Sequence, residues 1–205
     1  MCPALPRFVI YNGQLKTHES LALPASNRAF RYGDGVFESL RADHHGVWWA
    51  QRHFSRLEIA ARLLKVNMPE ELSFAGFLND FDTLYRASFP DKGPARFRLS
   101  LFRQAGGLYT PESRHADYLI EAIPLNNDAY RLSRQGKLID LCPDYPLVSG
   151  VLSSLKSISS LTYVMAGLYA SNKGLDDVLL LNQNGNLAEA VSSNLFVVFD
   201  NNLLT

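Results

Sequence analysis

The sequence has few cysteines, no excess of charge and no long apolar run, and each shortage excludes a class of protein. Its 205 residues include only Cys2 and Cys142, without a Cys-x-x-Cys spacing, so no disulfide framework is expected. The 20 basic residues balance the 20 acidic ones, which removes the electrostatic case for a nucleic-acid or membrane-surface partner. The longest apolar runs, such as residues 178–181, are too short to cross a membrane. With no signal peptide visible in residues 1–7, we expect a cytoplasmic protein with reduced thiols.

The common catalytic signatures are also missing. The sequence contains no GxGxxG after a predicted strand, no GxxxxGK[ST], no HExxH and no GxSxG. The adjacent pair His44 and His45 would point to opposite faces of a strand, which is a poor arrangement for a metal ion. We therefore expect a solvated turn there, and no metal site.

The pattern of apolar residues predicts an α+β fold. Residues 8–11 before Asn12-Gly13 predict a hairpin, and the alternating residues 36–40 predict a strand. Leu57, Ala60, Ala61 and Leu64 lie on one face of a helix over 52–66. A second helix is expected over 70–88, and further strands over 46–50, 95–103 and 117–124.

A polar stretch divides the chain into two domains. Residues 125–135 are polar and predict a linker between a small α+β domain, 1–124, and the first part of a larger domain, 136–205. In the second domain we expect a helix over 157–173. Strands are expected over 137–142, 177–181, 195–199 and 203–205.

One lysine and one glutamate stand out. Lys156 ends a stretch of apolar and small residues, so it is either drawn inward, where desolvation makes an amine nucleophilic, or extends into solvent from a helix start. Glu189 has small and apolar neighbours, so it needs a cationic partner or a cap if buried, or else lies exposed on a strand or loop. Taken residue by residue, the exposed alternatives are favoured.

Four segments, in order, resemble the class IV aminotransferases, which are pyridoxal-phosphate enzymes of fold type IV. The segments are 27–41 (NRAFRYGDGVFESLR), 53–57 (HFSRL), 155–157 (LKS) and 176–196, and their intervals agree over essentially the whole chain. The family includes branched-chain aminotransferases, D-amino acid aminotransferases and aminodeoxychorismate lyases. The resemblance implies a two-domain fold with pyridoxal 5′-phosphate in the interdomain cleft.

The resemblance also implies roles for particular residues. Lys156 matches the lysine that bonds to the cofactor aldehyde, and Arg56 the arginine that holds its phosphate. Glu189 matches the glutamate that keeps the pyridine nitrogen protonated, with Ser193 and Asn194 in the same cofactor-binding stretch. Arg98 resembles an arginine that binds the substrate carboxylate in branched-chain enzymes, although an exposed strand arginine is an equal alternative. The further substrate-binding candidates are Phe30, Arg41 and Tyr109.

The chain departs from the family pattern at three places. Ser159 and Ser160 stand where many relatives have an asparagine and then an aromatic or aliphatic residue, which predicts a different hydrogen bond near the cofactor. The loop 104–110 lacks the Arg-x-His pair of the D-amino acid enzymes, which counts against D-amino acid substrates. Family chains continue past Thr205 with a helix that completes the phosphate site. The chain is thus a naturally short member, a fragment or a product of premature termination, and we expect it to bind the cofactor weakly.

The predicted activity is transfer of an amino group between an amino acid and a 2-oxo acid. The first alternative is an aminodeoxychorismate lyase, which releases 4-aminobenzoate and pyruvate. The second is a cofactor-poor homologue without catalysis. As in the family, we expect a homodimer, with the loop around Gly106 and Gly107 approaching the partner's cleft.

Overall fold

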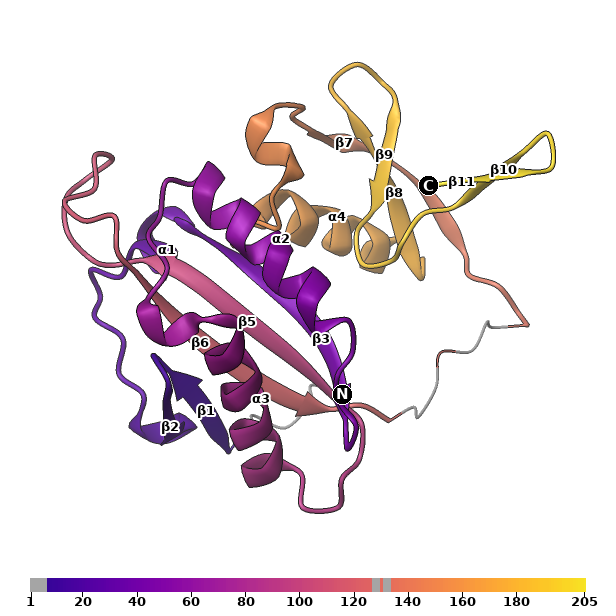
Figure 1. Ribbon diagram of the computed structural model, residues 1–205. Coiled ribbons are helices and arrows are strands. Elements are labelled where there is room, and N and C mark those ends of the chain that lie inside the picture. The colour runs from indigo at the N-terminus through magenta and orange to yellow at the C-terminus, as the bar shows by residue number, and fades with distance from the viewer. Residues whose placement is uncertain (1–6, 127–129, 131–133) are drawn as a thin grey trace. The chain divides into compact units, whose positions relative to one another are not determined.

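A computed structural model describes residues 7–126, 130 and 134–205. Contacts between residues divide the chain into two units, one of Met1–Tyr130 with Leu155–Ser159 and one of Arg131–Ser154 with Ser160–Thr205 (Figure 1). The predicted linker falls partly on residues 127–129 and 131–133, which lie outside the described residues.

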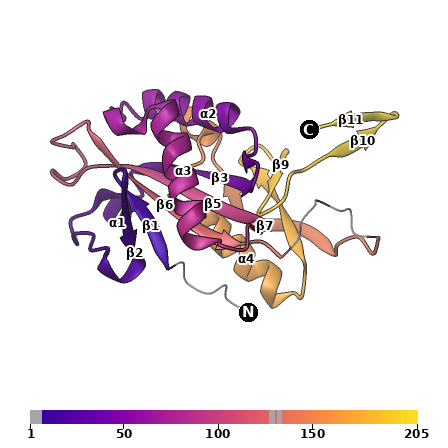
Figure 2. The same cartoon turned by 60° about the horizontal axis from the view of Figure 1, so that its bottom comes forward.

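The first unit is built on a six-stranded antiparallel sheet of order β2-β1-β6-β5-β3-β4. Its strands are β1 (Phe8–Tyr11), β2 (Gln14–Thr17), β3 (Gly35–Asp43), β4 (Gly46–Val47), β5 (Ala95–Arg103) and β6 (Ala116–Pro124). Its helices are α1 (Arg28–Tyr32), α2 (Ala50–Leu63) and α3 (Phe74–Ser88), with 3-10 turns η1 (His18–Ser20) and η2 (Glu70–Leu72). Helices α2 and α3 cover one face of this sheet, as Figures 1 and 2 show from two directions.

Local sequence accounts for much of this unit. Asn12 and Gly13 adopt the positive φ angles of 47° and 73° that a tight hairpin turn requires, which confirms the predicted hairpin. The predicted periodic face of α2 is buried at Leu57, Ala60 and Ala61. Helix α3 begins at the N-cap Ser73, whose hydroxyl accepts the amide of Gly76 at 3.2 Å.

Several predicted elements have different bounds in the structure: the helix expected over 70–88, for example, is divided into η2 and α3. The strand expected over 46–50 is only two residues long, because the chain turns into α2 at Ala50. The helix expected over 157–173 is α4 (Leu161–Asn172), which starts later. Residues 155–159 instead pair with β3: the Phe37 amide donates to the Lys156 carbonyl at 2.8 Å, and the Ile158 amide donates to the Gly35 carbonyl at 3.0 Å. Pairing with a strand edge satisfies backbone groups that a helix would otherwise satisfy.

The second unit has a three-stranded sheet of order β7-β8-β9, in which β7 is parallel and β9 antiparallel to β8. Its elements are β7 (Ile139–Leu147), η3 (Val151–Ser154), α4, β8 (Asp177–Asn182) and β9 (Leu187–Ala190), followed by the hairpin β10 (Val197–Phe199) and β11 (Asn202–Leu204). Helix α4 packs on β7 and β8 around the buried thiol of Cys142. Among the described residues, no helix is long and apolar enough to span a membrane.

Candidate active-site residues in the two units

Lys156 and Arg98 lie against the same aromatic ring in the first unit. The Nζ atom of Lys156 is 4.8 Å from the centre of the Phe37 ring, and the guanidinium carbon of Arg98 is 3.7 Å from it. Arg98 reaches the ring from β5, which pairs with β3, while Lys156 comes from the segment along the edge of β3. Two cations that share one ring form a place suited to an anion.

The side chain of Lys156 is exposed, which agrees with the alternative that the residue pattern alone favours. Leu155, the residue before it, packs against the hydrophobic core instead. Arg98 is half-buried, and burial together with the charge of Arg96 lowers its pKa, against the opposing charge of Glu121. A desolvated guanidinium of this kind interacts with an anion more strongly than a solvated one.

Glu38, the next residue of β3, points to the opposite face and binds Arg56. Consecutive strand residues face opposite sides, so Glu38 lies under α2, where only 2% of its side chain is exposed. It accepts hydrogen bonds from Arg56 Nε at 2.6 Å and from Arg56 Nη2, and its other contact is His53 Nδ1 at 2.8 Å. Burial alone would raise the pKa of Glu38, but the hydrogen bonds from Arg56 and His53 have a larger effect in the opposite direction. The pKa of Glu38 is therefore below its ordinary value. Arg56 is 52% exposed, and its Nη1 group takes no part in these bonds.

Glu189 lies in the second unit, on β9, and is exposed. Its Oε1 atom accepts a hydrogen bond of 2.6 Å from the hydroxyl of Tyr163 on α4. Burial and this bond to Glu189 raise the pKa of Tyr163, which therefore stays a donor. The hydrogen-bond partner of Glu189 is thus the phenol of Tyr163, and the Oε2 atom of Glu189 takes no part in that bond.

Ser193 is also in the second unit, in the loop after β9. The hydroxyls of Ser192 and Ser193 both donate to Oδ2 of Asp177, at 2.9 and 2.8 Å, while Asp177 Oδ1 accepts the amide of Val178. Burial alone would raise the pKa of Asp177, but these hydrogen bonds outweigh that effect, so its pKa is below the ordinary value. Asp177 therefore fixes the loop that carries Ser193 and the exposed Asn194.

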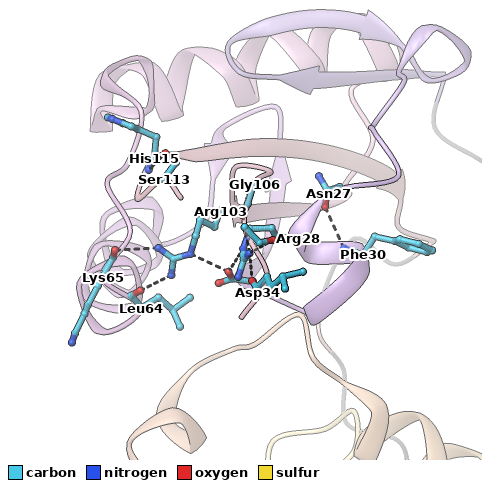
Figure 3. A network of polar contacts seen from close by, with 12 residues as sticks. Asn27, Arg28, Phe30, Asp34, Leu64, Lys65, Arg103, Gly106, Ser113 and His115 are labelled. Atoms are coloured by element: carbon cyan, nitrogen blue, oxygen red, sulfur yellow. Dashed lines mark hydrogen bonds and ion pairs between the residues drawn. The ribbon is translucent and has the colours of Figure 1, made fainter. Parts of the chain in front are cut away.

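A buried network holds the loop of residues 104–110, here called the glycine loop. Arg28 donates to the carbonyls of Gly106 at 3.0 Å and Leu108 at 2.6 Å, and its Nε is 2.8 Å from Asp34 (Figure 3). Asp34 also accepts Arg103 Nε at 3.0 Å. Since the side chains of Arg28 and Arg103 are 4% and 8% exposed, these charges depend on their partners.

The remaining substrate candidates make other contacts. Phe30, in α1, and Tyr109, in the glycine loop, are 83% and 90% exposed. Tyr109 touches the ring of Tyr32, with 5.6 Å between the ring centres. Arg41 is buried, and its guanidinium lies 5.0 Å from each of the rings of Trp48 and Tyr130.

The structure thus brings Lys156 and Arg98 to the ring of Phe37. Arg56 binds Glu38, the residue that follows Phe37 on β3. The structure holds Glu189 in the other unit. Sequence reasoning missed Phe37 as a site residue, although it lies within the recognised segment 27–41. It also missed Tyr163, which no spacing signal marks, because its contact with Glu189 exists only after α4 and β9 pack.

Comparison with known proteins identifies the family. The sequence model described as Amino-transferase class IV matches residues 35–205, and the chain belongs to this family. A protein of Methanocaldococcus jannaschii, provisionally named as a branched-chain-amino-acid aminotransferase, is 27% identical over 199 residues, covering 93% of this chain and 65% of that protein. An aminodeoxychorismate lyase of Vibrio harveyi is 23% identical over 197 residues, covering 95% of this chain and 68% of the lyase.

Solved structures share the fold. The branched-chain aminotransferase of Thermoproteus uzoniensis with norvaline superposes with a TM-score of 0.82 at 22% identity, over 97% of this chain and 67% of that chain. The branched-chain aminotransferase of Thermobaculum terrenum in its PLP form gives 0.74 at 18% identity, over 97% and 66%. The predicted α+β fold of this type is confirmed. The chain spans about two thirds of the length of these relatives.

Proposed function

We propose that this chain provides the reactive lysine, the substrate arginine and the ring-binding glutamate of an aminotransferase that uses pyridoxal 5′-phosphate. The observation that carries the proposal is the pair Lys156 and Arg98 at the ring of Phe37, 4.8 and 3.7 Å from its centre. An amine and a guanidinium beside one ring suit an amino acid, whose carboxylate binds the guanidinium while its Cα approaches the amine.

The donor set fits the cofactor in three respects. Lys156 offers an exposed amine for the aldehyde, and Arg56 keeps one guanidinium nitrogen outside its bonds to Glu38 for the phosphate. Glu189 keeps one oxygen outside its bond with Tyr163 for the pyridine nitrogen. When bound, pyridoxal phosphate supplies an electron sink for the negative charge that develops at the substrate Cα.

The residues of the chain then divide the remaining tasks. Arg98 binds and orients the substrate carboxylate, and its partial burial strengthens that bond. With the cofactor bound, the Lys156 amine would be placed to accept a proton from the substrate Cα as a general base, and the resulting ammonium would be able to donate a proton as a general acid. Tyr163 holds the carboxylate of Glu189 in one orientation, and Phe37 fixes the positions of the two cations beside its ring.

The test is covalent trapping on the purified 205-residue chain. After incubation with pyridoxal phosphate and reduction with borohydride, mass spectrometry should find the added mass on the peptide that contains Lys156. Lys65→Ala, at an exposed control lysine of the same unit, should leave the adduct in place, and Lys156→Ala should remove it. An adduct spread evenly over surface lysines would refute the proposal. Amino transfer from branched-chain L-amino acids to 2-oxo acids is the matching activity assay.

A lyase is the second candidate, because relatives from Vibrio harveyi and Bacillus subtilis are named aminodeoxychorismate lyase. Both activities would use the same lysine, arginine and glutamate. Release of pyruvate from aminodeoxychorismate without a 2-oxo acid acceptor would favour the lyase. Amino transfer that requires an acceptor would exclude it as the main activity.

The proposal includes a homodimer in the cytoplasm. The exposed Phe30, Leu108 and Tyr109 support an association surface near the glycine loop, since their large apolar side chains are 73–90% exposed. The free thiol of Cys142 is compatible with a reducing compartment. Sedimentation at micromolar concentration tests the dimer, and a monomer would contradict it.

A further inference from the structure

The segment that carries Lys156 is paired with β3 in one register. This segment, residues 155–159, is here called the lysine segment, and it belongs to the first unit. An antiparallel bridge joins Val36 to Ser157, which sets Lys156 opposite Phe37. Opposite residues of an antiparallel pair point to the same face, and a slip by one residue would turn the lysine to the other face. The position of the amine at the aromatic ring therefore depends on this register.

Two glycines allow the lysine segment to approach β3 closely. A Cβ atom at position 33 would lie 2.8 Å from the Cβ of Ser159, 3.1 Å from its Cα and 3.3 Å from its nitrogen. Non-bonded carbon atoms prefer a separation of about 3.5–4.0 Å, so a side chain at Gly33 would push Ser159 away. A Cβ atom at Gly35 would likewise lie 2.6 Å from Cδ1 of Ile158. The end of the lysine segment thus rests where β3 and the turn before it have no side chains.

The turn that contains Gly33 is fixed, whereas the end of the lysine segment is able to move. The carboxylate of Asp34 accepts Nε of Arg28 at 2.8 Å and Nε of Arg103 at 3.0 Å (Figure 3). The Arg103 amide also donates to the Asp34 carbonyl at 3.1 Å. Ser159, in contrast, is exposed. A side chain at position 33 would therefore be accommodated by lifting the Ser159 end of the lysine segment away from β3.

We propose that Gly33 is a positioning residue for Lys156. Because Gly33 has no side chain, Ser159 packs directly against it, and this contact holds the lysine segment in the register that places the amine at the ring of Phe37. The inference rests on the proposed function of Lys156, although the contact itself is measurable without a cofactor. Gly33 also has a φ of 64° at the end of α1, which favours glycine for a second reason. A control glycine with a similar φ separates the two reasons.

Amide hydrogen exchange measures the pairing, by NMR on the labelled 205-residue chain without cofactor. Gly33→Ala should speed exchange of the Phe37 and Ile158 amides about tenfold, the scale expected for a methyl group added to a packed contact. Gly13→Ala is the matched control, because Gly13 has a φ of 73° in the same unit, while the atom nearest to a Cβ there is Tyr118 Oη, at an ordinary 3.5 Å. It should leave both amides unchanged. Equal exchange in the two variants would overturn the proposal.

A compensating variant tests the contact from its other side. Gly33→Ala/Ser159→Gly removes the 2.8 Å approach between the two Cβ atoms, so it should recover protection toward that of Ser159→Gly alone. If circular dichroism shows that Gly33→Ala does not fold, recovery of the fold in the double variant supports the contact, and no recovery contradicts it. The Arg103 amide, bonded to Asp34, should stay protected throughout. Exchange that rises there as much as at Phe37 would mean that the turn moves, which is the opposite of the proposal.

Trapping of pyridoxal phosphate measures the amine itself. Under the borohydride conditions described above, adduct formation at Lys156 should slow about tenfold in Gly33→Ala, since a misplacement of about 1 Å costs up to a hundredfold. Gly13→Ala should keep the wild-type rate. An unchanged rate in Gly33→Ala, despite faster amide exchange, would overturn the positioning role. If the wild type forms no adduct at Lys156, the proposed function fails, whereas the exchange measurements still decide whether Gly33 holds the lysine segment.

Discussion

Replacing Glu38 by glutamine should destabilise the first unit. Glu38 is 2% exposed and is held by Arg56 and His53, with contacts of 2.6 and 2.8 Å. Breaking a buried ion pair costs about 3–5 kcal/mol, but Arg56 is half exposed, so solvent recovers part of its charge. Glutamine keeps one acceptor and turns an NH₂ group toward the donors of Arg56. We expect a loss of about 2–3 kcal/mol, which for a chain of this length lowers Tm by about 4–12 °C.

The effect should depend on pH in a defined direction. The pKa of Glu38 is lower in the folded chain than its ordinary value, because the bonds from Arg56 and His53 outweigh desolvation. A lowered folded pKa adds stability that is present above the unfolded pKa of about 4.3 and is lost as pH falls through the folded pKa. The difference between the wild type and Glu38→Gln should therefore be constant near neutral pH and shrink below about pH 4.

Tryptophan fluorescence in urea is the suitable assay, since both tryptophans, Trp48 and Trp49, belong to the first unit. Glu70→Gln, at an exposed position, is the control and should change stability by less than about 0.5 kcal/mol. The double variant Glu38→Gln/Arg56→Gln should lose less than the sum of the two single variants. Full additivity, or a Glu38→Gln difference that persists at about pH 3, would show that the reasoning about this pair is wrong.

Three further perturbations test other contacts. Burial raises the pKa of Asp80, against the hydrogen bond from Tyr118, so its contribution is present below the unfolded pKa of about 3.9 and lost as pH rises through the folded pKa. In urea titrations at several pH values, Asp80→Asn should remove the loss of stability that the wild type shows as pH rises. If the variant still shows that loss, Asp80 is not its source. Because burial and the bond to Glu189 raise the pKa of Tyr163, Glu189→Gln should move one tyrosine ionisation to lower pH in absorbance titrations, and no movement would count against the contact. Arg28→Met should cost about 3–5 kcal/mol and speed hydrogen exchange in the glycine loop, whereas unchanged exchange would deny its anchoring role.

Periodicity and turn chemistry were enough to predict the framework of the first unit. The strand at residues 95–103 and the apolar face at Leu57, Ala60 and Ala61 are present as expected. Both signals arise from side-chain spacing along a regular backbone, which depends only on nearby residues. The helix expected from residue 157 begins at Leu161, because the preceding residues pair with β3, a strand more than a hundred positions earlier. Local propensity carries no information about such a distant partner.

In the candidate site, too, the sequence predicted the residue types, while contacts between distant segments decided their partners. The resemblance of four ordered segments was sufficient to single out Lys156, Arg56 and Glu189, because the chemistry of each role restricts the residue type. Which groups meet is decided by packing. The sharing of one ring by Lys156 and Arg98, and the phenol on Glu189, depend on strand pairing and helix docking between distant segments. The sequence by itself determined the family, the periodic elements and the reactive residue types. Only the tertiary structure decided their partners and exposure, since non-local contacts fix how far each charge is removed from water.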